Sequence, residues 1–285
     1  MHPVPYHRPS TIDGALTLMR GLDSARLIAG GTDLLLRMKA GGARPNALIS
    51  LRNIEELSQV SIDVSAGARL GALVSLADLE NNAELMQKWP VLGQCLRHFA
   101  SVQIRNAATL GGNLCNASPA ADLAPPLLVL DAQALLVGLQ GRRSVPLADF
   151  FVGPGRTCLG PDELLEAVQI DAPHLDQRAI YFKRMRTAMD VALVSVAAMV
   201  VVQDGVLTEV RLAAGSVAAV PMRLRGAEDL LRGQRASPAL FTEARAKAMA
   251  EVRPITDLRA GADYRRQLVG VYLQRALHAL CGEES

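Results

Sequence analysis

Two Gly-Gly pairs, each close to a threonine, constrain the fold of this 285-residue chain more than any other feature. The first lies in Leu27–Leu34, between a short apolar run and a helical pattern, and the second in Thr109–Asn113. Glycine permits positive φ and close approach, so consecutive backbone N–H groups in a tight turn can converge on a diphosphate. Neither segment fits the Rossmann fingerprint or the phosphate loop of NTPases. From the residues alone, a plain structural corner and a dinucleotide site are about equally supported.

Composition narrows the class of protein. Half of the residues are hydrophobic, and the net charge of +2 gives no electrostatic case for nucleic acid as the main ligand. The apolar run Val191–Val202 is shorter than the roughly 20 residues needed to span a bilayer, so we expect buried core, no membrane span and a cytoplasmic protein. The four cysteines form no CxxC pair, which predicts reduced thiols and no metal site.

The pattern along the chain predicts an α+β protein with two domains. Residues 1–57 alternate helix and strand, and residues 58–173 form a mixed second lobe. The best boundary follows residue 173, and residues 174–285 read as an antiparallel sheet followed by helices. The three predicted strands are Ile180–Arg184, Val194–Val202 and Val206–Ala213, the last two joined by an Asp204-Gly205 hairpin turn. The predicted helices are Gly226–Leu231, Pro238–Val252 and Tyr264–Leu280.

Two longer stretches carry a family resemblance. AGGTDLLLRMKAG (Ala29–Gly41) and TLGGNLCNASPAADLAPPLLVLDA (Thr109–Ala132) resemble the flavin signatures of the medium, FAD-binding subunits of molybdenum hydroxylases, the xanthine dehydrogenase and carbon monoxide dehydrogenase family. The resemblance continues through Tyr181-Phe182-Lys183 to the tail. It implies a two-lobed PCMH-type FAD-binding domain followed by a C-terminal domain like that of carbon monoxide dehydrogenase flavoproteins.

The resemblance also assigns cofactor contacts, with no catalytic residue and no metal ligand on this chain. Asp122 would accept hydrogen bonds from ribose or ribityl hydroxyls, although it could instead cap a helix starting near Leu123. Lys183 would face an anion or a flavin carbonyl, or else be a surface lysine, and Leu34 would pack on the isoalloxazine ring. The full set is Leu27, Ile28, Ala29, Gly30, Gly31, Thr32, Asp33, Leu34, Phe99, Thr109, Leu110, Gly111, Gly112, Asn113, Asp122, Leu165 and Lys183.

The function that the resemblance implies is an electron relay. A large molybdopterin-binding subunit would oxidise the substrate, and a small [2Fe-2S] subunit would pass the electrons to non-covalently bound FAD on this chain. The reduced flavin would reduce an external acceptor, in a complex expected to be a dimer of heterotrimers. Two alternatives stay open, a stand-alone PCMH-type FAD oxidoreductase and a scaffold subunit that has lost its flavin.

Overall fold

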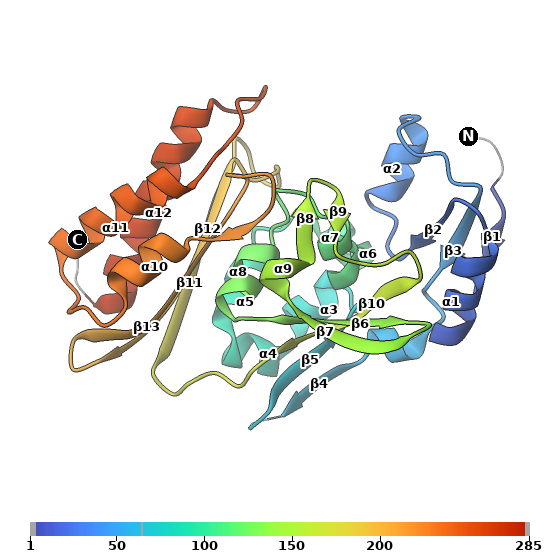
Figure 1. The fold of residues 1–285 in the computed structure, drawn as a ribbon, viewed down its shortest axis with the longest axis horizontal. Helices are drawn as coiled ribbons and strands as arrows, with labels where there is room; N and C mark the ends of the chain where they lie inside the picture. Colours follow the sequence, from blue (N-terminus) through green and yellow to red (C-terminus); the bar gives the residue numbers. More distant parts are fainter. Residues whose placement is uncertain (1–3, 64, 283–285) are drawn as a thin grey trace.

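The computed structural model describes residues 4–63 and 65–282, which form three units in a row (Figure 1). The N-terminal lobe at one end contains a parallel sheet of order β1-β3-β2. Its apolar core joins Ile12 and Leu16 of the first helix to Ile49 of the central strand. The elements are β1 (Tyr6–His7), α1 (Ile12–Gly21), β2 (Ala25–Ile28), α2 (Leu34–Lys39), β3 (Ala47–Ser50) and a 3-10 turn (Glu55–Ser58).

The middle lobe contains an antiparallel five-stranded sheet of order β4-β5-β10-β6-β7, covered by short helices. Its strands are β4 (Val60–Asp63), β5 (Gly67–Gly71), β6 (Gln133–Gly138), β7 (Gly141–Pro146) and β10 (Glu163–Ile170), with a small ribbon of β8 (Phe151–Gly153) and β9 (Arg156–Thr157). Its helices are α3 (Leu76–Asn81), α4 (Ala83–Lys88), α5 (Pro90–Leu96), α6 (Val102–Ala107), α7 (Leu110–Cys115), α8 (Ala124–Val129) and α9 (Leu147–Phe150).

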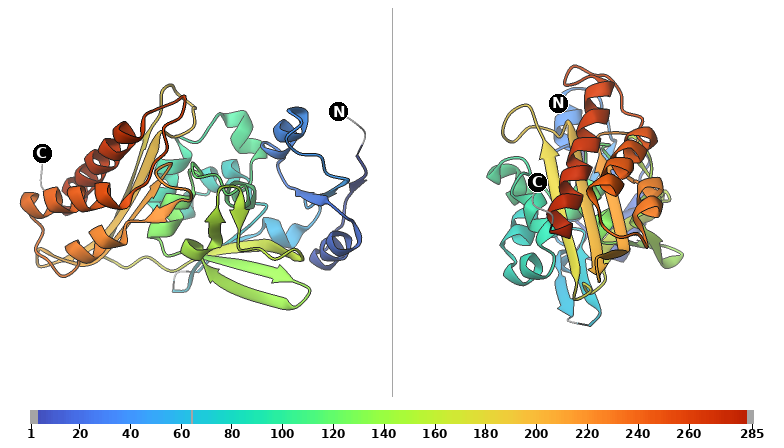
Figure 2. Two further views of the ribbon diagram at one scale, coloured as in Figure 1. Left: turned by 45° about the horizontal axis from the view of Figure 1, so that its top comes forward. Right: turned by 90° about the vertical axis from the view of Figure 1, so that its left-hand side faces the viewer.

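The C-terminal unit contains the three long strands that the sequence predicts and a short fourth strand that it does not. They are β11 (Gln177–Arg184), β12 (Val194–Gln203), β13 (Val206–Gly215) and β14 (Met222–Arg223), in that order across the sheet. The helices α10 (Arg225–Leu231), α11 (Pro238–Glu251) and α12 (Ala262–Cys281) cover one face, as the views in Figure 2 show.

Strand β12 is apolar along most of its length because it is covered on both faces. Val196 and Val200 face α10–α12, whereas Ala197 and Met199 face the middle lobe. A strand that is covered on both faces needs apolar residues at successive positions instead of alternating ones. The prediction that this run is buried core is therefore confirmed for residues 192–201, whereas Val191 at its start is exposed and Val202 at its end is partly buried.

The seam between the C-terminal sheet and the middle lobe is closely packed. The backbone N–H of Ser216 donates to the carbonyl oxygen of Pro119 at 2.7 Å. A Cβ atom on Gly215 would lie 3.2 Å from Cγ of Pro125 and 2.6 Å from Oγ of Ser195. Glycine is therefore required where the sheet meets the start of α8.

Within the described residues 4–63 and 65–282, no helix is both long enough and apolar enough to cross a membrane.

Candidate cofactor site

A cavity of about 880 Å³ lies between the N-terminal lobe and the middle lobe. Both Gly-Gly segments line it, the first from the end of β2 and the second from the start of α7. The loop between β11 and β12 adds Met189, Asp190 and Val191 to its wall. All of the predicted cofactor residues line the cavity except Leu110 and Lys183, whose side chains are buried behind its wall.

The first segment has the geometry of an anion-binding turn. Gly31 has a φ of +74°, and a Cβ atom on Gly30 would lie 1.9 Å from the carbonyl oxygen of Ala107, where the two lobes touch. In the described part of the chain, none of the backbone N–H groups of residues 30–34 donates a hydrogen bond to a protein atom. Because unpaired backbone donors need a partner, this wall offers a row of N–H groups to a ligand.

The second segment corrects the sequence prediction, because it is the first turn of α7 and not a tight loop. Thr109 caps this helix, its Oγ1 accepting from the N–H of Gly112 at 3.0 Å. The N–H of Gly111 donates to the carbonyl oxygen of Ala72 at 2.7 Å, and a Cβ atom on Gly111 would lie 2.8 Å from the same atom. The glycines here serve close packing of the helix on the sheet, and their N–H groups are already used.

Polar side chains complete the cavity. Asn113 Oδ1 is buried and has no hydrogen-bond partner among the described residues, which leaves it available to a ligand group. Three arginines, Arg26, Arg37 and Arg44, also line the cavity and bring positive charge to the N-terminal lobe's side. Sequence reasoning missed them, although all three lie in or beside the segment that contains the first Gly-Gly pair.

Asp122 and Lys183 meet in the structure, although 61 residues separate them. Lys183 Nζ lies 2.8 Å from Asp122 Oδ2 and also donates to the carbonyl oxygen of His98, and its side chain is only 1% exposed. The hydroxyl of Tyr181 donates to Asp122 Oδ1 at 3.3 Å. Burial raises the pKa of Asp122, and the Lys183 ammonium and the Tyr181 hydroxyl limit that rise.

This geometry decides two of the open alternatives. Lys183 is not a surface lysine, because its ammonium is buried against the Asp122 carboxylate. Asp122 does not cap the following helix, since Leu123 occupies the N-cap position of α8 without a side-chain bond.

Part of the remaining wall is apolar. Phe99 and Leu165 are buried and Leu34 is half-buried, and all three line the cavity. Leu165 lies at an irregularity in the pairing of β10 with β6, which alters the local register beside the cavity. A flat hydrophobic ring system could pack against such a wall.

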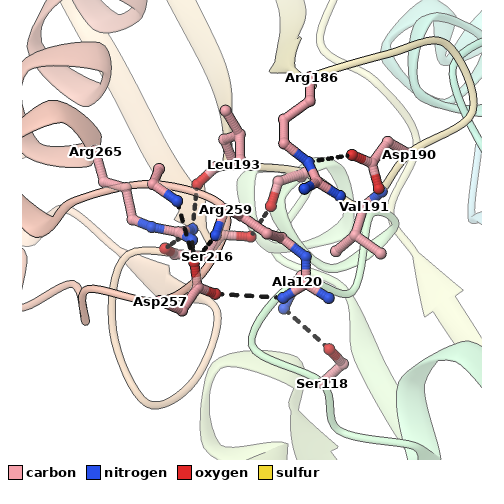
Figure 3. A network of polar contacts seen from close by, with 12 residues as sticks. Ser118, Ala120, Arg186, Asp190, Val191, Leu193, Ser216, Asp257, Arg259 and Arg265 are labelled. Carbon is pink, nitrogen blue, oxygen red and sulfur yellow. Dashed lines mark hydrogen bonds and ion pairs between the residues drawn. The ribbon is translucent and has the colours of Figure 1, made fainter.

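The loop that carries Met189 and Val191 is held by charged pairs (Figure 3). Arg186 Nε lies 2.8 Å from Asp190 Oδ2, an ion pair within the loop. Beside it in Figure 3, Asp257 contacts both Arg259 and the buried Arg265. Sequence reasoning missed Met189 and Val191, which no glycine or charge pattern marks.

Metal chemistry and thiol chemistry find no support at this site. No group of three or more His, Cys, Asp or Glu residues that could hold a metal ion occurs in the described chain. Cys115 lines the cavity, but burial, with the nearby Cys158, raises the pKa of its thiol to about 12. A thiol with such a pKa stays protonated and is a poor nucleophile.

Family comparisons identify the cofactor that proteins of this kind carry. Residues 2–173 match the family described as the FAD binding domain in molybdopterin dehydrogenase, and residues 179–280 match the CO dehydrogenase flavoprotein C-terminal domain. The chain belongs to the FAD-binding medium subunits of molybdenum hydroxylases. It is therefore the FAD-carrying oxidoreductase subunit of this class of enzyme.

Individual relatives of this medium subunit cover nearly its whole length. The glyceraldehyde dehydrogenase medium chain of Sulfolobus acidocaldarius is 32% identical, over 95% of this chain and 96% of the relative. The xanthine dehydrogenase FAD-binding subunit of Escherichia coli O157:H7 is 30% identical, over 95% and 94%. The solved carbon monoxide dehydrogenase of Hydrogenophaga pseudoflava that lacks the Mo-pyranopterin moiety matches with a TM-score of 0.96 and 30% identity, covering 100% of both chains.

Proposed function

We propose that this medium subunit holds FAD in the inter-lobe cavity and relays electrons through it. The electrons would come from iron–sulfur clusters of a small partner subunit, which a large molybdopterin-binding subunit reduces as it oxidises the substrate. The reduced flavin would then pass them to an external acceptor. The proposed assembly is a dimer of heterotrimers, and the cytoplasmic location and the domain boundary after residue 173 stay predictions.

The observation that carries this proposal is the row of unpaired N–H groups at residues 30–34 on one wall of the cavity. A diphosphate needs several converging donors, and these groups supply them without competing partners. Arg26, Arg37 and Arg44 supply positive charge on the same side. The buried, unpartnered Asn113 Oδ1 on the opposite wall fits a hydroxyl or amino donor of the cofactor.

The other proposed contacts follow from the chemistry of each side chain. Asp122 keeps lone pairs beyond those that Tyr181 and Lys183 use, and these can accept from ribityl or ribose hydroxyls. Phe99, Leu165 and Leu34 offer the apolar surface, with Leu34 proposed to pack on the isoalloxazine ring. When bound, FAD supplies reversible two-electron chemistry, and this chain would hold and orient it.

Cofactor binding is tested on the purified subunit. We expect it to take up stoichiometric FAD, with a flavin absorption spectrum, and to release free FAD into the supernatant on acid denaturation. Flavin that stays on the denatured polypeptide would show covalent attachment. A protein that stays colourless after incubation with FAD would contradict the proposal and favour a flavin-free scaffold.

Electron relay is tested on the assembled complex before and after removal of FAD. Without the flavin, substrate should still reduce the iron–sulfur clusters, but reduction of the external acceptor should stop and return when FAD is restored. Unchanged acceptor reduction without FAD would contradict the relay. Substrate turnover by the isolated medium subunit, with no partner present, would favour a stand-alone FAD oxidoreductase.

A further inference from the structure

Helix α2 borders the cavity and packs little of its apolar surface against the rest of the protein. It carries three consecutive leucines, yet none of its six residues is buried. Leu36 is 63% exposed and Leu35 is 38% exposed, while Leu34 lines the cavity. In Figure 1, α2 projects from the N-terminal lobe on the side that faces α6 and α7. Since helices in proteins are stabilised mainly by packing of an apolar face, α2 depends on contacts other than a core.

Two glycines with positive φ mark the ends of the α2 segment. Gly31 precedes the helix with a φ of +74°, and Gly41 follows it with a φ of +76°. The carbonyl oxygen of Arg37 accepts from the N–H groups of Gly42 and Ala43, at 2.8 and 3.2 Å, so the end of the helix is satisfied locally. The segment can therefore change its orientation at its two ends without losing its internal hydrogen bonds.

One side-chain hydrogen bond ties this helix to the opposite wall. Arg37 Nη2 donates to Asn116 Oδ1 at 2.6 Å, across 79 residues of sequence. Asn116 is the C-cap residue of α7, and both side chains line the cavity. Within residues 4–63 and 65–282, no other side chain of α2 makes a hydrogen bond or an ion pair.

We propose that α2 is a lid over the cofactor and that the Arg37–Asn116 hydrogen bond is the latch that holds it closed. With the latch formed, the segment that supplies the unpaired N–H groups is fixed against the second wall, and bound FAD cannot leave without breaking it. With the latch open, α2 swings at its two glycine ends and the cavity admits or releases FAD. Arg37 and Asn116 thus govern retention of the cofactor, and this inference rests on FAD occupying the cavity.

The test measures the rate at which FAD leaves the purified holo-subunit after dilution, by the recovery of flavin fluorescence. Asn116→Ala and Arg37→Leu should each release FAD about two- to tenfold faster, the range expected for one hydrogen bond. The double variant should be no faster than the faster single variant, because both changes remove the same bond. Lys39→Met is the matched control. It removes a positive charge from the same helix, and Lys39 does not line the cavity.

A second readout follows the lid itself. Asn116→Ala keeps both tryptic sites of α2, after Arg37 and after Lys39, so any change in cleavage there reports opening of the helix. We expect faster trypsin cleavage at these sites in Asn116→Ala than in the natural protein, both loaded with FAD. Arg37→Lys, which keeps the charge and one donor, should release FAD at a rate between those of the natural protein and Arg37→Leu.

The outcomes separate the latch from the proposed function. A natural protein that binds no FAD would contradict FAD binding itself. FAD that binds normally but leaves Asn116→Ala at the natural rate would overturn the latch alone. Faster release from Arg37→Leu but not from Asn116→Ala would also overturn it, since Arg37 would then act only through its charge on the cofactor.

Discussion

The two walls of the cavity carry the same dipeptide but are built in opposite ways. On the N-terminal wall, the Gly30-Gly31 turn leaves the N–H groups of residues 30–34 unpaired, and the helix that follows has no buried residue. On the middle-lobe wall, Gly111-Gly112 lies inside a capped helix whose N–H groups are all used by the protein. The N-terminal wall thus offers free donors to a ligand, whereas the middle-lobe wall is held rigidly by its own hydrogen bonds.

A glycine pair therefore indicates a steric requirement of the backbone before it indicates a ligand. Gly31 is required by its positive φ, whereas Gly111 is required because the helix lies against Ala72. The N-terminal wall can move because the rigid middle-lobe wall still holds the cofactor in a fixed position. Substitutions in the middle-lobe wall should therefore lower mainly the stability of the fold. Substitutions in the N-terminal wall should lower mainly the affinity for the cofactor.

The largest effect is expected from Lys183→Met, which removes the buried partner of Asp122 behind the rigid wall. Removing the ammonium leaves the buried Asp122 carboxylate without its counter-charge, which should lower the free energy of unfolding by about 3–5 kcal/mol. Chemical unfolding of the FAD-free protein measures this. Arg232→Met, which breaks an exposed pair with Asp229, is the control and should cost about 0.5 kcal/mol or less.

The same variant should show a distinctive pH dependence. Burial already raises the pKa of Asp122, and loss of the Lys183 charge that lowers it should raise this pKa further. A carboxyl whose folded-state pKa is raised destabilises the fold as the pH rises above its unfolded-state pKa, and the penalty is full above the folded-state pKa. The deficit of Lys183→Met should thus be full at mildly alkaline pH and shrink as the pH falls and Asp122 takes up a proton. A deficit that is constant with pH would show that lost packing, not the charge, causes it.

An intermediate effect is expected from Gly111→Ala on the same wall. The added Cβ atom would lie 2.8 Å from both Cβ and the carbonyl oxygen of Ala72, so the helix must shift, at a cost of about 1–3 kcal/mol in unfolding free energy. Gly112→Ala is the matched control, because its Cβ atom meets only the Thr109 hydroxyl. Thermal unfolding should show a clear drop for the first variant and a smaller one for the second. Equal drops would contradict a packing role that is specific to Gly111.

The smallest effect on stability, with the largest on FAD binding, is expected from Gly31→Val. A side chain at this φ costs about 1–2 kcal/mol, and the valine would displace the N–H groups from the cofactor. Gly233→Val is the control, since Gly233 has a φ of +76° and lies away from the cavity. Gly31→Val should unfold at a slightly lower denaturant concentration than Gly233→Val, because a Cβ atom on Gly31 would lie 3.1 Å from Leu35 and 3.2 Å from Ile28. Only Gly31→Val should lose FAD in equilibrium dialysis. Full occupancy in Gly31→Val would place the diphosphate elsewhere.

Local patterns allowed most of the fold to be predicted. The strands of the C-terminal sheet follow from apolar runs bounded by turn residues, and Asp204 and Gly205 both adopt the positive φ that a two-residue hairpin requires. The short strand β14 escaped prediction because two residues carry no period. α7 escaped because its glycines oppose helix formation, and only the Thr109 cap and the contact with Ala72 reveal why a helix forms there.

The site was predictable where it is continuous in sequence and not where it is assembled by the fold. The two Gly-Gly segments can be recognised in the sequence. No local sequence pattern shows that Lys183 contacts Asp122 or that Arg37 contacts Asn116. These pairs are 61 and 79 residues apart, so their contact depends on how β11 and α2 are placed. The absence of burial along α2 is likewise a tertiary property, since its leucines suggest a buried helix.

The Gly215 seam has a mechanical consequence. Because the C-terminal sheet and the middle lobe share one apolar core, with Pro125 and Pro119 set directly against Gly215 and Ser216, these two units cannot hinge apart without opening that core. The middle lobe and the C-terminal unit, which together contain most of the polypeptide, thus behave as a single rigid body. Any adjustment that accompanies a redox cycle must be made by the smaller N-terminal lobe, which makes that lobe the place to look for motion by hydrogen exchange.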